Sequence, residues 1–491
     1  MRSRFLVALA PLVVLAFGGM ANATVVAACS FPKQPTHSYR PAGGTAPPEA
    51  DRHSGLRGEV CERATGEAGM EPMLAVGRKG TLFMGIATAK GLYEQPGELT
   101  GTAKNALLRS RDSGRKWTRI PLPGGINSSE GFPYIDPDTD RLFVTSFSAD
   151  LTRCGQPVIY SDDDGAHWTK STQRPGCFPP TLGDWPKIFS GPHRPGATSG
   201  YPSAVYLCNF IPNILVAASI GCWRSDDGGA TFGFTSFLPT INGACVAGGR
   251  RGGTGATIVH GSGRVLSDGT VVVPLTVCGK PFVVRSSDEG SSWTAVPTGD
   301  DGLGLDDILA GDEGLVLGVT DHVWSENLAV DGHDNLFFVY TAAGGVRMAT
   351  SRDGGRTWRL LGLVSPPLMR HAVVASVTAR GRGQVALTYY GTADQGDALG
   401  ASGMNWRGWM ESSRNALAAH PLFQSAPTSP ADAPTMDSSM PGCCTVGQTF
   451  LEYTGVQFTG RREVSAAFTR WMGGKLPELV FAQMRIAPRR R

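Results

Sequence analysis

The chain has 491 residues, which is enough to bury a large core. Its 65 Gly and 34 Pro are about a fifth of all residues, while 41% of residues are hydrophobic and 18% are charged. This composition excludes a disordered chain and favours a turn-rich globular one. The formal net charge of +3 gives no electrostatic case for a nucleic-acid partner.

The first residues have the pattern of an export signal. Two arginines precede an apolar stretch that is too short to cross a bilayer, and Ala21-Asn22-Ala23 is a small-x-small cleavage site. We therefore predict a signal peptide over residues 1–23, a secreted or extracytoplasmic protein, and no transmembrane segment. In the alternative, Val26-Ala27-Ala28-Cys29 is a bacterial lipoprotein box, and the protein is anchored at Cys29.

Ten cysteines in an exported chain indicate disulfide bonds. Zinc binding calls for paired CxxC knuckles, which the sequence lacks. Spacing along the chain favours the pairs Cys154–Cys177, Cys208–Cys222 and Cys245–Cys278. The adjacent Cys443 and Cys444 have different partners, and the complete connectivity does not follow from the sequence.

Pairs of short β-rich runs, bounded by Gly, Pro and Asp turns, follow one another along the chain. They lie at 71–76 with 81–84, 132–135 with 141–144, 185–188 with 204–207, 257–259 with 270–273, 327–331 with 336–339, 373–377 with 384–387, and 450–458 with 464–468. A further run at 479–484 follows the seventh pair. The continuous apolar character of the inner runs suits strands that are buried on both faces.

A second pattern, Ser-x-Asp-x-Gly-x-x-Trp or Phe, occurs five times at intervals of 51 to 65 residues. The Asp carboxylate can accept backbone N–H bonds across a tight turn, the Gly supplies a positive φ, and the aromatic ring packs on the sheet below. A structural role is therefore predicted for the five aspartates, which are Asp112, Asp163, Asp227, Asp288 and Asp353. A weaker sixth copy is Ser413-x-Asn415.

Repeated four-stranded units of about 60 residues are typical of a β-propeller. We predict an all-β propeller of six or seven blades: the strand pairs favour seven and the Ser-x-Asp pattern favours six. The propeller is placed at 61–491, with a polar long-loop insertion at about 391–447. Residues 24–60 are predicted to be an N-terminal extension, and a strand before Glu71 could complete the last blade and close the ring.

The five Ser-x-Asp copies resemble the Asp-box, or BNR, repeats of sialidases and related secreted propellers. The resemblance implies a propeller, a glycan partner, and glycoside hydrolysis with a Tyr–Glu pair and an Asp acid/base. Sialidases also carry Arg-Ile-Pro on the first inner strand, with an arginine that binds the substrate carboxylate. Here the matching stretch is Met70-Glu71-Pro72, so the arginine is replaced by methionine, which cannot form a bidentate contact with a carboxylate.

Propeller ligands bind where the inner strands begin, at one mouth of the central channel. The carboxylates expected there, Asp184 and Glu326, are the candidate catalytic pair, because glycoside hydrolysis uses two carboxyl groups. Candidates for substrate binding are Trp185 and Trp324, which could stack on a sugar, Arg370, which could hold an anion, and also His371 and Glu71. In the alternative interpretation the carboxylates cap turns and the tryptophans pack between blades.

No cofactor is predicted. Oxygen-rich spacing at Asp136-x-Asp138-x-Asp140 and over residues 331–335 suits Ca²⁺, but both stretches fall at expected hairpin turns, so turn chemistry is favoured. The sequence thus leads to two functions. The first is a secreted, monomeric sialidase-like propeller that binds or hydrolyses a carbohydrate. The second is a non-catalytic propeller that binds protein partners.

Overall fold

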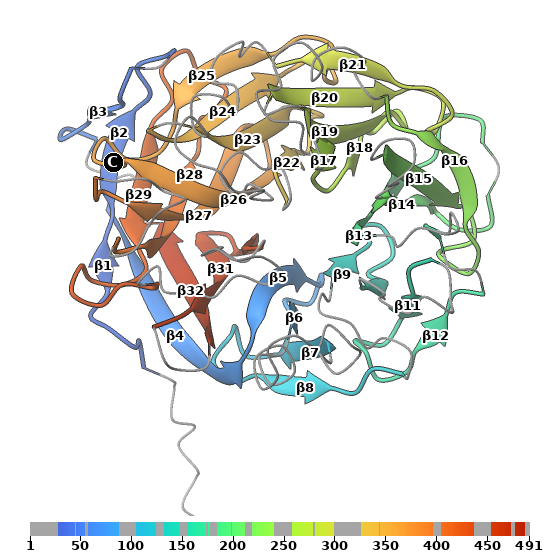
Figure 1. The fold of residues 1–491 in the computed structure, drawn as a ribbon, viewed down its shortest axis with the longest axis horizontal. Helices are drawn as coiled ribbons and strands as arrows, with labels where there is room; N and C mark the ends of the chain where they lie inside the picture. Colours follow the sequence, from blue (N-terminus) through green and yellow to red (C-terminus); the bar gives the residue numbers. More distant parts are fainter. Residues whose placement is uncertain are drawn as a thin grey trace, which may run out of the picture.

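The structure is a computed structural model that describes residues 28–44, 46–54, 57–87, 105–123, 132–146, 155–172, 175–176, 184–197, 199–211, 219–239, 258–277, 280–298, 326–342, 344–395, 404–436, 453–472 and 477–486. Within these residues every regular element is a β-strand. The strands form seven antiparallel sheets that are arranged as blades around a common centre (Figure 1). The prediction of a seven-bladed propeller is therefore confirmed, and the count of strand pairs was the better guide to blade number.

Within each blade the strands run from the centre outward in chain order, and we call the centre the hub. Blade 1 contains β5 (Met70–Val76), β6 (Leu82–Ala87), β7 (Asn105–Ser110) and β8 (Thr118–Ile120), and blade 2 contains β9 (Phe132–Ile135), β10 (Leu142–Thr145), β11 (Val158–Ser161) and β12 (Thr169–Lys170). Blade 3 contains β13 (Asp184–Pro192), β14 (Ser203–Ile211), β15 (Ser219–Ser225) and β16 (Gly233–Phe237). Blade 4 contains β17 (Ile258–His260), β18 (Arg264–Val265), β19 (Val271–Val277), β20 (Lys280–Ser286) and β21 (Thr294–Pro297).

Blades 5 to 7 follow the same order. Blade 5 contains β22 (Leu328–Val330), β23 (Leu336–Ala342), β24 (Gly345–Ser351) and β25 (Arg359–Leu363). Blade 6 contains β26 (His371–Arg380), β27 (Gln384–Thr392), β28 (Arg407–Ser413) and β29 (Phe423–Pro427). Blade 7 contains β30 (Gly455–Gly460), β31 (Glu463–Arg470) and β32 (Glu478–Ile486). The N-terminal segment adds β2 (His37–Arg40) and β3 (Glu49–Ala50) to the outer edge of blade 6, and β4 (Gly58–Ala68) and β1 (Gln34–Pro35) to blade 7.

The pairing of β4 with β32 closes the ring. The two strands are antiparallel from Gly58 opposite Ile486 to Ala68 opposite Glu478, so a strand near the start of the chain becomes the fourth strand of the last blade. The first strand of blade 1 follows directly after β4. The exact limit between an N-terminal extension and the propeller, placed at residue 60 from the sequence, stays a prediction.

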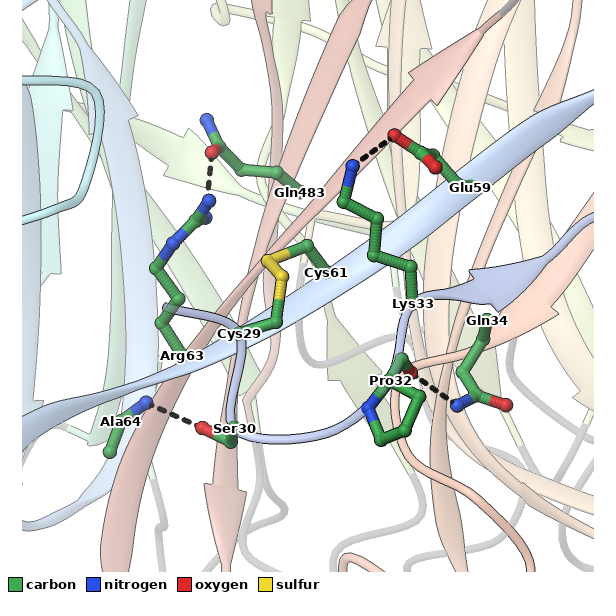
Figure 2. The surroundings of a disulfide bond; sticks show 10 residues. All are labelled: Cys29, Ser30, Pro32, Lys33, Gln34, Glu59, Cys61, Arg63, Ala64 and Gln483. Atoms are coloured by element: carbon green, nitrogen blue, oxygen red, sulfur yellow. Dashed lines mark hydrogen bonds and ion pairs between the residues drawn. A yellow bond between two sulfur atoms is a disulfide. The ribbon is translucent and has the colours of Figure 1, made fainter. Parts of the chain in front are cut away.

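A disulfide holds the segment before β4 against that strand (Figure 2). Cys29 is bonded to Cys61, and on either side of the bond Lys33 pairs with Glu59 and the Ser30 hydroxyl accepts the N–H of Ala64. Anchoring at Cys29 through a lipoprotein box stays the alternative prediction. The predicted pair Cys208–Cys222 is confirmed and links β14 to β15. The other predicted pairs and Cys443 and Cys444 lie outside the described residues.

The five Ser-x-Asp segments, which we call Ser–Asp turns, share one set of hydrogen bonds. In blade 1 the Ser110 hydroxyl donates to Asp112 Oδ1 (2.8 Å) and accepts the N–H of Gly114 (2.9 Å), and the N–H of Lys116 donates to the same carboxylate oxygen (2.9 Å). The turns of blades 2 to 5 repeat these contacts. The backbone N–H bonds help to keep the pKa of each aspartate low, which is the behaviour of a structural carboxylate.

Each Ser–Asp turn is seated on the preceding blade. A Cβ added to Gly114 would meet Phe481 of blade 7, and the following Trp117 packs edge-on against the same ring with centroids 5.3 Å apart. In blade 2 the Trp168 indole donates to Pro121 of blade 1, and in blade 4 that of Trp293 donates to Ser236 of blade 3. The turns therefore both fasten their own hairpin and hold adjacent blades together.

The stretch 391–447 differs from the single long loop that was expected. It contains β28 and β29, the third and fourth strands of blade 6. Their composition is polar, yet almost every residue is buried because β2 pairs with β29 on the outside. The weak sixth copy is a real variant of the turn, in which the Ser413 hydroxyl donates to Asn415 Oδ1 at 3.2 Å.

Blade 6, to which β2 is added, contains a buried acid. Glu411 on β28 is fully buried, and the Tyr389 hydroxyl donates to its Oε2 (3.0 Å). Tyr39 of β2 is buried near the same carboxyl group, and its hydroxyl donates to the carbonyl of Val364. Burial raises the pKa of Glu411 to about 8. The folded protein therefore keeps this carboxyl protonated at a pH where the unfolded chain has released the proton.

We expect Gly114→Ala to destabilise the protein more than Gly80→Ala. Both glycines have a positive φ (79° and 78°), but only at Gly114 would the new methyl group meet a packed ring, with Phe481 Cε1 at 2.0 Å; at Gly80 nothing lies within 4 Å. The φ alone costs about 1–2 kcal/mol, and overpacking adds about 1–3 kcal/mol. Urea denaturation of both variants measures the difference. Equal losses would show that the turn is not seated on blade 7 as described.

We expect Glu411→Gln to stabilise the protein relative to wild type as the pH rises. Between the unfolded pKa near 4.5 and the folded pKa of about 8, the folded state holds a proton that the unfolded state lacks. The wild type therefore loses about 1.4 kcal/mol of unfolding free energy per pH unit from this group. Urea denaturation at several pH values should show that the difference in unfolding free energy between the variant and wild type grows as the pH rises. The exposed Glu49→Gln is the control, whose curve should stay parallel to wild type.

Candidate functional site

The innermost strands of three blades carry the same distortion close to where they begin. In β5, β13 and β26 the register shifts by one residue, and the residues at the bulges, Glu71, Trp185 and Val374, have positive φ values of 55°, 49° and 57°. Such conformations cost about 1–3 kcal/mol each, and they cluster at functional sites. Because alternate strands of a blade run in opposite directions, these bulges lie at the end of the hub opposite the Ser–Asp turns. This end is our candidate site.

A buried lysine lies in the hub beside the bulge of β13. Lys187 is 1% exposed; its ammonium lies 4.2 Å from the centre of the Phe132 ring and 4.5 Å from that of Tyr453, and it donates to the Tyr453 hydroxyl at 3.2 Å. Phe132 begins β9 and Tyr453 precedes β30, so three blades meet at this charge. Two aromatic faces and one hydroxyl compensate for the water that the ammonium has lost.

Glu326 provides the opposite charge in the hub. This residue precedes β22, is 9% exposed, and its carboxylate receives a hydrogen bond from Gln457 of β30 (3.2 Å) and lies 3.7 Å from the Arg264 guanidinium of β18. Burial raises the pKa of Glu326, while Arg264, Gln457 and Lys187 oppose the rise. The group is therefore a carboxyl whose proton affinity is increased, which is the property that a general acid requires.

His260, the last residue of β17, is fully buried, and Lys187 is close enough to act on its charge. Its Nδ1 lies 3.2 Å from the carbonyl of Gly261. Burial, assisted by the positive charge of Lys187, lowers the pKa of His260 to about 3. The ring therefore stays neutral at neutral pH, and the hub carries one fewer positive charge than its basic residues suggest.

The candidates from the sequence take different places in the structure. Trp185 is 3% exposed and its ring packs on Phe210, with centroids 4.8 Å apart, which agrees with packing inside a blade and leaves no open face for a sugar. Arg370 is exposed, and the half-buried His371 ring lies 6.5 Å from that of Trp406. The structure thus places Glu326 in the hub and Arg370 and His371 at the start of β26.

Two candidates cannot be placed from the structure. Trp324 lies outside the described residues, and for Asp184 the structure fixes the backbone at the start of β13 but not the side chain. Met70, where sialidases carry an arginine, is fully buried in an apolar cluster. Glu71 is buried beside it at the bulge of β5.

The aspartates with calcium-like spacing hold turns together. The Asp136 carboxylate accepts the N–H of Asp138 and the hydroxyls of Tyr201 and Ser203, and Asp331 accepts the N–H groups of residues 333, 335 and 383. In the part of the chain that the structure describes, no cluster of three or more His, Cys, Asp and Glu side chains is placed to hold a metal ion.

Sequence reasoning missed Lys187, Arg264, Tyr453 and Gln457. A signal for Lys187 was present, because it is a lone charge in the apolar run Trp185-Pro186-Lys187-Ile188-Phe189. A charge in a buried strand needs a partner, and the hub is where one can be found. No comparable signal marks Tyr453 or Gln457, whose roles depend on the meeting of blades 1, 3, 5 and 7.

No protein-family model matches the chain, and no curated protein matches it. Solved structures with a similar fold include a protein of unknown function from Dyadobacter fermentans (12% identity, TM-score 0.46, 87% of this chain and 99% of that one). Others are YCF48 from Cyanidioschyzon merolae (10%, 0.44, 86% and 98%) and a leech intramolecular trans-sialidase (12%, 0.39, 86% and 69%). These similarities are too weak to transfer a function.

We expect His260→Gln to reduce the loss of stability in acid. The folded pKa of about 3 lies below the ordinary value of 6.5, so the unfolded chain gains a proton first as the pH falls through 6.5. Unfolding free energy then decreases by about 1.4 kcal/mol per pH unit, an effect that glutamine removes. Urea denaturation at pH values above and below 6.5 tests this. The exposed His37→Gln should behave like wild type, and equal acid sensitivity of all three proteins would contradict the prediction.

Proposed function

We propose that the protein is an exported, sialidase-like propeller that acts on a glycan at the hub end bearing the bulges of β5, β13 and β26, and that Glu326 donates the proton in glycoside hydrolysis. The environment of Glu326 is the observation that carries this proposal. Burial raises the pKa of Glu326, and a hydrogen bond from Gln457 holds its carboxyl group in place. Such a group can carry a proton when the substrate binds. Asp184, at the start of β13, is proposed as the second carboxyl group.

The cation beside Glu326 suits an acidic sugar. The guanidinium of Arg264 lies 3.7 Å from Glu326 and is partly exposed, so a carboxylate on the substrate can reach it in competition with Glu326. The five Ser–Asp turns, which resemble Asp boxes, support a propeller of the sialidase-like type. They do not identify the substrate, because one fold serves many functions.

A second candidate function is a binding propeller without catalysis. Met70 in place of the sialidase arginine and the buried ring of Trp185 favour it, because both remove contacts that would hold a sugar during reaction. In that case the same hub end binds a glycan or a protein and releases it unchanged.

Two disulfides agree with an oxidising compartment outside the cytoplasm. Nowhere in the described chain is there a helix long and apolar enough to span a bilayer. Export through a signal peptide over residues 1–23 and a monomeric state are part of the proposal.

We expect Glu326→Gln to abolish hydrolysis of the glycosides that the wild type cleaves. Loss of a general acid lowers kcat by roughly 10²–10⁴-fold. A panel of fluorogenic α- and β-glycosides, including sialosides, measures activity, and urea denaturation checks that the variant is folded. Lys79→Gln, an exposed change at the other end of the hub, is the matched control. Hydrolysis that persists in Glu326→Gln would rule out this residue as the acid. Glycan binding without hydrolysis by the wild type would establish the second function.

A further inference from the structure

Blade 7 lacks the turn that covers the blade before it. Its third strand, β32, reaches Ile486 and its fourth strand, β4, begins at Gly58, so no turn joins them. In blades 1 to 5 the Ser–Asp turn occupies this position and contacts the preceding blade. In blade 6 the carbonyls of residues 417–419 accept hydrogen bonds from Arg352 and Arg359 of blade 5. Among the described residues, therefore, no third-to-fourth-strand turn covers the corresponding edge of blade 6.

Two cavities lie where a third-to-fourth-strand turn of blade 7 would be. One has a volume of about 680 Å³ and lies between the start of β4, the β30–β31 turn and the end of β32. The other, of about 400 Å³, extends from that turn to blade 6. They share Arg461, Arg462 and Ile486 in their walls, and we call them together the closure groove.

The closure groove carries an excess of positive charge. Arg57, Arg461, Arg462 and Arg485 are exposed, and none of their guanidinium groups bonds to any other residue that the structure describes. One of the two carboxylates in the wall, Glu59, is paired with Lys33 (Figure 2). The guanidinium N–H groups of these arginines can therefore donate hydrogen bonds to a bound anion.

Arg380 holds the turn that presents two of these arginines. Its guanidinium lies 4.0 Å from the centre of the Phe458 ring and donates to the carbonyls of Gly460 (2.8 Å) and Arg461 (2.6 Å). Burial lowers the pKa of Arg380, and the nearby Arg414 contributes to the shift. The position of Arg461 and Arg462 is thus fixed by contacts from blade 6, and the groove is a built feature of the seam between blades 6 and 7.

We propose that the closure groove binds an acidic polysaccharide, one that carries sulfate or carboxylate groups along its chain. The cations are spread over two joined cavities, so they match an extended polyanion better than a single anion, and the guanidinium fork suits sulfate and carboxylate. Glu463 in the wall can accept sugar hydroxyls. The Phe458 ring has Arg380 over one face and packs against a core cluster, so it does not offer the open aromatic face on which the bases of a single-stranded nucleic acid stack.

This site lies at the opposite end of the propeller from the hub bulges, and it does not depend on the proposed hydrolysis. A secreted protein could hold a polysaccharide in the closure groove while the hub is occupied or empty. Loss of the hub function in Glu326→Gln should leave binding at the groove unchanged.

The test compares Arg461→Gln/Arg462→Gln with Lys79→Gln/Arg194→Gln. Both double variants remove two exposed positive charges from first-to-second-strand turns on the same face, but only the first pair lines the groove. The probes are a heparin oligosaccharide, an oligogalacturonate and single-stranded DNA of matched charge, titrated calorimetrically at an ionic strength of about 0.15 M.

We expect the wild type and the control to bind an acidic oligosaccharide with Kd values within about twofold of each other, and the groove variant to bind at least about tenfold more weakly. The heparin and galacturonate arms distinguish sulfate from carboxylate as the recognised group. A variant without residues 487–491 should bind like wild type, which separates the groove from the terminal arginines. Equal weakening of both double variants, an effect confined to the shortened chain, or tighter binding of DNA than of either oligosaccharide would overturn the proposal.

Discussion

The pairing of β4 with β32 is the constraint on which the rest of the molecule depends. It joins residues 58–68 to residues 478–486, so the ring closes only when nearly the whole chain is in place. Closure packs blade 7 against blade 1, so that neither end of the row of blades keeps an uncovered face, and it fixes the distances across the hub. The contacts of Lys187 and Glu326 involve blades 2, 3, 4, 5 and 7, and therefore exist only in the closed ring.

A buried ion pair fixes the register of this closing seam. Glu62 of β4 is 1% exposed and pairs with Arg470 of β31, across the neighbouring strand β32. A slip of β4 by one residue would turn Glu62 to the other face and leave a buried charge without a partner, which costs far more than the pair itself contributes. The Cys29–Cys61 bond holds the preceding segment beside the same strand. Charge and covalent bond thus act together where the sheet has no turn to set its register.

The fold could be predicted from the sequence because its signals are local. The hairpins around residues 71–84 and 132–144 show short apolar runs bounded by turn residues, and the Ser–Asp turns need only eight consecutive residues. The strands within 391–447 escaped because β28 and β29 are polar, and burial by β2 does not appear in their own composition. Pairing of Cys29 with Cys61 escaped for a similar reason, since the bond depends on ring closure.

The site was predicted only in part, because it forms from side chains that are distant in sequence. Glu326 was expected at the mouth of the channel from its position before an inner strand; the structure places its carboxylate beside Arg264 and Gln457, and its catalytic role stays a prediction. Its partners Arg264 and Gln457 come from blades 4 and 7, and no spacing along the chain links them. Trp185 was proposed as a sugar platform, but the bulge turns its ring into the core of its own blade. Side-chain direction at a bulge does not follow the alternation of a regular strand.

The two ends of the ring differ because turns of different kinds meet there. On one face, each third-to-fourth-strand turn is hydrogen-bonded and seated on its neighbour, so adjacent blades are held together there wherever a turn is present. Blade 7 exchanges that turn for a pairing between distant strands, and the vacated place is lined by arginines that blade 6 positions through Arg380. Around the opposite end, three strained bulges surround buried charges that compensate one another. An anionic ligand therefore meets arginines without ion-pair partners among the described residues at the seam, and binding there displaces no side chain of the protein. In the hub, the same ligand must compete with Glu326 for Arg264.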